Sequence, residues 1–213
     1  MADTQDRSTA SAGGDRPERA ARVAAMQRAE RTRARRRRTL LIAVPTVVVL
    51  GVAGGVTAVL ANQPDPPSLS AVKTYSYPAS QHTTAKQTYA ENPPVGGPHN
   101  PVWLNCGVYA APVASENAVH SMEHGAVWIT YRPDLAASAV GTLKQDVSGK
   151  DYTILSPYPG LPSPIVLSAW NNQLQVSDAD DPRIGAFLAK FVQGAQTPEP
   201  GALCSNGTGT PTG

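Results

Sequence analysis

All four histidines of this 213-residue chain lie between positions 82 and 124. His120 and His124 share the run Val119–Gly125, and their spacing of four puts both on one face of a helix or of a strand. Neutral imidazole is a ligand for copper and zinc, and a carboxylate or thioether beside it could complete such a site. The alternative is that each histidine separately forms hydrogen bonds that pack its own segment. We expect a copper or zinc ion, with these candidate ligands: His82, His99, His120, His124, Met122 and Glu123.

The same run fits the pattern H-x-x-E-H of inverted zinc peptidases. In that chemistry His120 and His124 would hold zinc, and Glu123 would act as general base on a bound water. A third protein ligand and a long helix would also be needed, whereas Gly125 ends the predicted helix at once. No G-x-S-x-G motif is present either. The sequence therefore leans away from an enzyme and keeps the hydrolase as an alternative.

A further alternative is a cell-envelope binding or structural module without a metal, in which aromatic side chains line a groove for a peptide or a sugar. Its candidate residues are Trp103, Tyr109, Trp128, Tyr131, Tyr158 and Trp170. Aromatic residues on predicted strands more often belong to the core. After residue 61 the chain contains 7 basic and 11 acidic residues. That net charge of −4 disfavours nucleic acid and other polyanions as partners.

The N-terminal 38 residues are basic and poor in large apolar side chains. They contain 11 arginines and 5 acidic residues, so we expect a cytoplasmic, disordered segment that is transiently helical within Pro17–Arg35. Residues 39–61 are then 23 uncharged residues in a row, and a helix that spans a membrane needs about 20. The arginines before this run predict a cytoplasmic N-terminus and an extracellular C-terminal domain in a single-pass protein of the cell membrane.

Two other interpretations of residues 39–61 stay open, a buried helix of a soluble protein and a cleaved signal. Val59 and Ala61 suit a signal peptidase, but the apolar run and the segment before it are long for a signal, so we expect a retained anchor. The predicted continuation is a proline-rich linker at 62–74, an extracytoplasmic domain at 75–204 and a flexible tail at 205–213.

Regular structure is clearest after residue 114. Ser115 is expected to cap a helix that runs to Glu123. The following expected elements are a strand at 126–131, a helix from 133 to about 147, strands at 152–156, 164–170 and 173–177, and a helix from 181 to 193. The last two strands form a hairpin across Asn171–Asn172. This order predicts an α+β domain with helices packed on a small mixed sheet, and it is compatible with a thioredoxin-like topology.

Before these elements, residues 77–112 are rich in proline and glycine and need to be pinned. Cys106 and Cys204, the only cysteines, are both expected outside the membrane, where oxidising conditions favour a disulfide between them. That bond would tie the tail to the histidine-rich stretch. The alternative is that one thiolate is a copper or zinc ligand. No C-x-x-C motif is present, so a thioredoxin-like topology would imply no redox function.

Several short motifs between Tyr75 and Phe191 together resemble a family of actinobacterial proteins catalogued as domain of unknown function 3105. The matching residues are His82, Tyr89, Asn92–Pro94, Gly97–His99, Cys106–Tyr109, Val119–Gly125 and Val127–Tyr131. Gly96 and Met122 depart from the family pattern, which has Ser and often Leu there. Members typically follow an N-terminal membrane span, so the resemblance implies a membrane-anchored architecture. It implies no particular activity.

Overall fold

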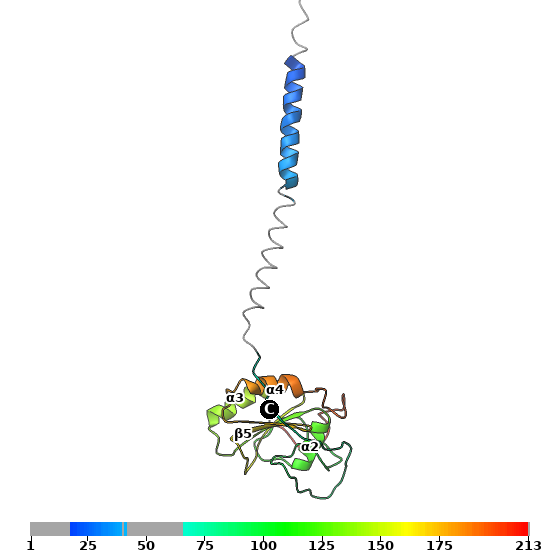
Figure 1. Ribbon diagram of the computed structural model, residues 1–213, viewed down its shortest axis with the longest axis vertical. Helices are drawn as coiled ribbons and strands as arrows, with labels where there is room; N and C mark the ends of the chain where they lie inside the picture. Colours follow the sequence, from blue (N-terminus) through cyan, green and yellow to red (C-terminus); the bar gives the residue numbers. More distant parts are fainter. Residues whose placement is uncertain (1–17, 40, 42–65, 213) are drawn as a thin grey trace, which may run out of the picture. The chain divides into compact units, whose positions relative to one another are not determined.

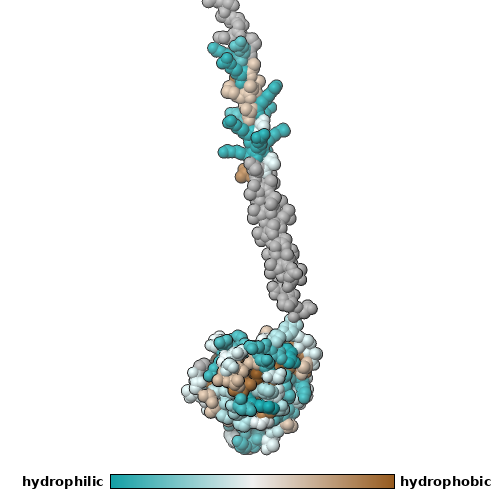
Figure 2. All heavy atoms as spheres, turned by 90° about the vertical axis from the view of Figure 1, so that its left-hand side faces the viewer, coloured by the Kyte–Doolittle hydropathy of each residue, from teal (hydrophilic) through white to brown (hydrophobic). Residues whose placement is uncertain are grey.

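The computed structural model describes residues 18–39, 41 and 66–212, and the chain divides into two units, Met1–Asp65 and Pro66–Gly213. In the first unit residues 18–39 form an exposed helix, along which Figure 2 shows hydrophilic side chains. No helix among the described residues is both long and apolar enough to cross a membrane. The span predicted at 39–61 lies outside the described residues, except for Thr39 and Leu41.

The second unit is built on one mixed sheet of six strands (Figure 1) in the order β1-β6-β5-β3-β4-β2. The strands are β1 (Lys73–Thr74), β2 (Gly107–Val108), β3 (Val127–Tyr131), β4 (Thr153–Pro157), β5 (Ile165–Ala169) and β6 (Asn172–Val176). β3 and β4 are parallel because a helix connects them, whereas β5 and β6 form the predicted antiparallel hairpin. β5 also pairs antiparallel with β3. The mixed sheet of the predicted α+β domain is therefore confirmed.

Three helices cover the two faces of this sheet: α2 (Ser115–Glu123), α3 (Ala137–Val147) and α4 (Arg183–Phe191). α3 and α4 lie together on one face, and α2 lies on the other (Figure 1). Side chains of β3 alternate between the two layers: Val127 and Ile129 pack with α3 and α4, while Trp128 packs with α2. Since both faces are covered, every residue of β3 is buried.

The structure corrects the predicted bounds of the three helices. α4 begins at Arg183 instead of residue 181 and ends at Phe191 instead of residue 193. Ser115 is the first residue of α2 instead of its cap, and the capping position is Ala114, which makes no capping side-chain bond. The helix expected from residue 133 begins only at Ala137. The N–H of Leu135 donates to the carbonyl of Arg132, so Pro133 and Asp134 form a separate turn before the helix. The predicted ends of α2 and α3 hold to within a residue, and Gly125 follows α2 at φ +99°.

The irregular stretch before α2 is pinned to the domain as expected. His82 and His99 pair in an isolated parallel bridge, and the predicted disulfide joins Cys106 to Cys204. Residues 205–212, where a flexible tail was expected, lie along residues 103–108: the N–H of Asn105 donates to the carbonyl of Thr208 at 2.8 Å. Segments from both ends of the domain thus meet beside α2.

Candidate metal centre

The four histidines meet at one place beside the C-terminal end of α2. The ring centroids lie 4.5 Å apart for His120 and His124, 4.7 Å for His82 and His120, and 5.0 Å for His99 and His120. His82 and His99 are 4.9 Å apart. The four side chains therefore lie close together, as predicted, although they come from three separate segments of the chain.

Local structure explains how each ring reaches this place. His120 and Glu123 lie on adjacent turns of α2, and His124 is the residue that caps its C-terminus. The bridge between His82 and His99 brings the other two rings to the same end of the helix. The C-terminal segment also binds the backbone at this end of α2, because Glu199 donates its N–H to the carbonyl of Glu123 at 3.1 Å.

Three of the rings are oriented in the same way by backbone carbonyls. Nδ1 of His99, His120 and His124 lies 2.8, 2.6 and 2.6 Å from the carbonyl oxygens of Gly97, Asn100 and Leu203. A carbonyl oxygen only accepts, so each Nδ1 must carry the hydrogen. In a neutral ring the lone pair is then on Nε2, the atom left to face the cluster.

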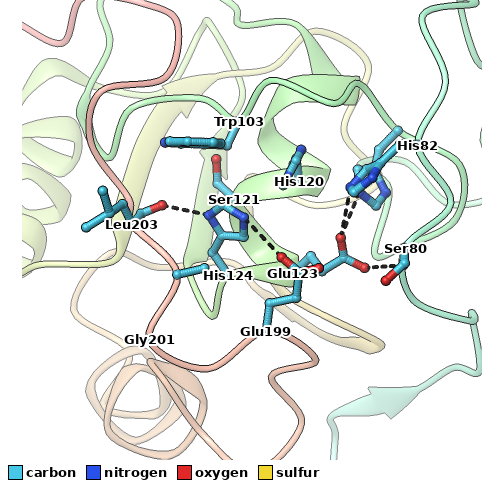
Figure 3. Close-up of polar contacts among 12 residues, drawn as sticks. Ser80, His82, Trp103, His120, Ser121, Glu123, His124, Glu199, Gly201 and Leu203 are labelled. Carbon is cyan, nitrogen blue, oxygen red and sulfur yellow. Dashed lines mark hydrogen bonds and ion pairs between the residues drawn. The ribbon is translucent and has the colours of Figure 1, made fainter.

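The carboxylate of Glu123 contacts two of these rings (Figure 3). Its Oε2 is 2.9 Å from Nε2 of His99 and 3.5 Å from Nε2 of His82. Its Oε1 accepts the N–H of Ser80 at 2.6 Å. Because Nδ1 of His99 already donates to Gly97, Nε2 can donate to the carboxylate only when the ring carries two protons. A metal ion between these two atoms would replace that second proton.

Burial sets the charge states of the cluster. Desolvation first, and then the neighbouring histidines, lower the pKa of His120 from an ordinary value of 6.5 to about 4, against the opposing effect of the hydrogen bond to Asn100. Desolvation would raise the pKa of Glu123, but the bonds from His99 and Ser80 outweigh it, so this pKa is lowered. Near neutral pH the site therefore contains a neutral His120 and an ionised Glu123, which are the metal-binding forms of both side chains.

These side chains form two groups that could hold a metal ion. His82, His99, His120 and Glu123 offer ligand atoms that all lie within 4.8 Å of one another, and so do His120, His124 and Glu199. Only His82 among the first four is exposed. The C-terminal end of a helix carries partial negative charge, so the end of α2 also favours a cation. The arrangement can bind a divalent transition metal through imidazole nitrogen and carboxylate oxygen.

Met122 is the predicted ligand that the structure does not bring to this group. The segment is helical, which turns Met122 away from His120 and His124, and its side chain is fully buried in the apolar cluster with Trp128 and Ile154. The strand geometry that would align Met122 with the two histidines is absent. Cys106 and Cys204 are joined to each other, so neither offers a thiolate.

Sequence reasoning did not connect three residues with the cluster: Glu199 and Leu203 were not considered, and Trp103 was a candidate only for an aromatic groove. Nε2 of His124 lies 3.4 Å from Oε2 of Glu199, and its Nδ1 is held by the carbonyl of Leu203 (Figure 3). The ring of Trp103 covers both α2 histidines, at 5.1 Å from His124 and 5.8 Å from His120. The predicted disulfide was a usable signal, because it ties the segment around Glu199 to the histidine-rich stretch.

The geometry argues against the two alternative functions, a zinc hydrolase and a groove lined by aromatic side chains. A zinc hydrolase would need Glu123 to face a water on an ion held by His120 and His124, but its carboxylate is bonded to His99 and Ser80. An aromatic groove would need exposed rings. Four of its six candidates are buried in the core, namely Tyr109, Trp128, Tyr131 and Trp170.

The comparisons with known proteins give a family without an assigned activity. Searches of curated proteins and of solved structures found no match. The family model described as "Protein of unknown function (DUF3105)" matches residues 80–206, more than half of the chain and all four histidines. The chain therefore belongs to the DUF3105 family.

Proposed function

We propose that this protein binds a divalent transition-metal ion, zinc or copper, through His82, His99, His120 and Glu123. The observation that carries the proposal is the orientation of the two buried rings, His99 and His120: Nδ1 of each donates to a backbone carbonyl, which leaves each Nε2 for the cluster, and Nε2 of His99 lies 2.9 Å from the carboxylate of Glu123. Separate structural histidines have no reason to place three imidazoles and one carboxylate within 4.8 Å of one another. A cation among them would accept the lone pairs of the neutral imidazoles and balance the charge of the ionised carboxylate.

The donor set favours particular ions. Three imidazole nitrogens and one carboxylate oxygen suit Zn²⁺ and Cu²⁺, whereas Cu⁺ prefers sulfur ligands. Met122, the nearest sulfur in sequence, packs in the core on the other side of α2. A tetrahedral zinc would need its ligands about 2.0–2.1 Å away, so the side chains must close by small rotations on binding.

Metal analysis of the purified full-length chain tests this proposal. After loading with Zn²⁺ or Cu²⁺ and dialysis, we expect one ion per wild-type chain. Glu123→Gln should weaken binding by at least about tenfold, because it removes a charged ligand. Glu116→Gln is the matched control: Glu116 is also on α2 and accepts a backbone N–H, from Gln87 at 3.0 Å, but it lies outside both ligand groups. A wild type that binds neither ion, or an equal loss in both variants, contradicts the proposal.

We also infer that the domain is held outside the cell membrane, in an actinobacterial, membrane-anchored protein. The run of 23 uncharged residues at 39–61 and the arginines before it support an anchor with a cytoplasmic N-terminus. The Cys106–Cys204 pair supports an oxidising compartment. Protease added to intact cells should then remove residues 66–213 and leave residues 1–38 protected. Protection of the whole chain would refute this topology.

A thioredoxin-like arrangement is a finer proposal for the sheet. The adjacent strands β4-β3-β5-β6, with α3 between β3 and β4 and with α4 last, support it. An experimental structure with a different strand order would exclude it.

A further inference from the structure

The second group of ligands, His120, His124 and Glu199, is built differently from the first. It contains three protein ligands instead of four, and the side chain of Glu199 is 37% exposed. Zinc sites with four protein ligands are closed, whereas sites with three leave a position for water or for an incoming ligand. We call the two groups the four-ligand position and the three-ligand position.

His120 belongs to both groups, and it can serve only one ion at a time. Its Nδ1 is 2.6 Å from the carbonyl oxygen of Asn100, so the ring offers the single lone pair on Nε2. When an ion occupies the four-ligand position, the other group keeps only His124 and Glu199. The two positions therefore exclude each other as complete sites.

The neighbouring rings make a short path between the positions. His82 and His120 are stacked with an interplanar angle of 23°, and His124 lies on the other side of His120 with ring centroids 4.5 Å apart. An ion bound to His120 needs only a small displacement to exchange its remaining ligands. The ring of Trp103 lies beside both His120 and His124, with ring centroids 5.8 and 5.1 Å away.

We propose that a single divalent transition-metal ion moves between the four-ligand and three-ligand positions, passing through His120, and is loaded and released from the three-ligand position. The inference rests on the proposed metal binding. The four-ligand position, with three imidazoles, holds the ion more tightly. The three-ligand position has an open coordination site, where a ligand atom of another molecule can bind the ion before the protein ligands dissociate from it. The ion is then a cargo exchanged with a carrier or chelating partner.

Rates of zinc release test this proposal. The full-length protein is loaded with one equivalent of Zn²⁺ and mixed with excess chromogenic chelator, and wild type is compared with Glu199→Ala. The variant should still bind one ion, with an affinity within about threefold of wild type, but release it at least about tenfold more slowly. Glu199 is partly exposed and its backbone bond to Glu123 survives the substitution, so the fold should remain intact. Near-UV circular dichroism verifies this.

Glu116→Ala is the control, and it should release zinc at the wild-type rate. An unchanged release rate in Glu199→Ala overturns the exchange between positions, and so does a wild type that holds two ions per chain. Both outcomes leave metal binding itself intact. A wild type that binds no zinc refutes the proposed function as well, so the two failures are distinguishable.

Discussion

The two faces of the sheet are built in opposite ways. The face under α3 and α4 is packed mainly with apolar side chains such as Ile129, Leu143 and Phe187, and regular elements supply nearly all of them. The face under α2 also buries His99, His120 and Glu123, and irregular segments complete it. Burying polar groups costs free energy unless they are bonded, and here each has a partner within the chain. The first face stabilises the fold, and the second also holds the histidine cluster in place.

The irregular segments on the α2 face stay in place through specific bonds instead of a repeating ladder. Asn171 fixes residue 77 with its side chain, the His82–His99 bridge fixes the next turn, and the disulfide fixes the C-terminal segment. Such bonds position side chains precisely enough for coordination but contribute little individually. Stability and metal binding should therefore respond to different substitutions.

The largest effect is expected on the α3 and α4 face. Phe187 is fully buried and packs with Phe191, with ring centroids 4.4 Å apart. Phe187→Ala should lower the free energy of unfolding by about 3–5 kcal/mol, because it leaves a cavity in the apolar layer. Urea denaturation measures this. Phe187→Leu, which keeps most of the volume, should lose less; equal losses would show that the layer is loosely packed.

Acid should destabilise the metal-free protein through the α2 face. The pKa of His120 is about 4 in the folded protein and 6.5 ordinarily, so between these values the unfolded chain takes up a proton that the folded chain does not. Stability is then lost as the pH falls from about 6.5 to 4, by about 3 kcal/mol. The lowered pKa of Glu123 adds to the loss below about pH 4.5.

Urea denaturation at several pH values measures this dependence, and His120→Gln should flatten the curve between pH 6.5 and 4. A wild-type curve no steeper than that of the variant would mean that His120 titrates normally.

Zinc should stabilise the protein by an amount that does not change when the face under α3 and α4 is mutated. At an unbound zinc concentration of one hundred times the dissociation constant, the free energy of unfolding should rise by about 2.7 kcal/mol. The same increment is expected in Phe187→Leu, because Phe187 packs in the layer of α3 and α4, whereas the histidines gather at the end of α2 on the other face of the sheet. Thermal denaturation with and without zinc provides the comparison. Different increments would mean that the two faces are coupled.

A smaller effect on stability is expected at Asn171, where the hairpin of β5 and β6 holds the irregular segment at Tyr77. The side-chain oxygen of Asn171 accepts the N–H of Tyr77 at 2.8 Å, and its amide donates to the carbonyl of Tyr77 at 3.1 Å. Its φ is +61°, which asparagine and glycine tolerate better than alanine. Asn171→Ala should therefore lower the free energy of unfolding by about 1–2 kcal/mol, and Asn171→Gly by less. Chemical denaturation distinguishes them; a larger loss in the glycine variant would contradict the role of φ.

The sequence predicted the regular part of the domain closely, since periodicity and turn residues are local signals. The strands around Trp128 and the hairpin at Asn171 lie within a residue or two of their expected places. The predicted helix starts were wrong where the same residues are compatible with two local structures. Pro133 and Asp134 suit a helix start as well as an isolated turn, and Ser115 suits a cap as well as a first helical residue.

The sequence by itself determined that imidazoles are concentrated in one stretch, that two of them share a helix face with Glu123 close by, and that two cysteines are available to pair. Only the tertiary structure decided which donors meet. Met122 turned to the core because the segment is a helix, and Glu199 arrived from the C-terminal segment. The physical reason is that the lone pairs of His120 and His124 are directed by distant carbonyls, those of Asn100 and Leu203, which lie 20 and 79 positions away along the chain. Such a bond leaves no periodic trace in the sequence.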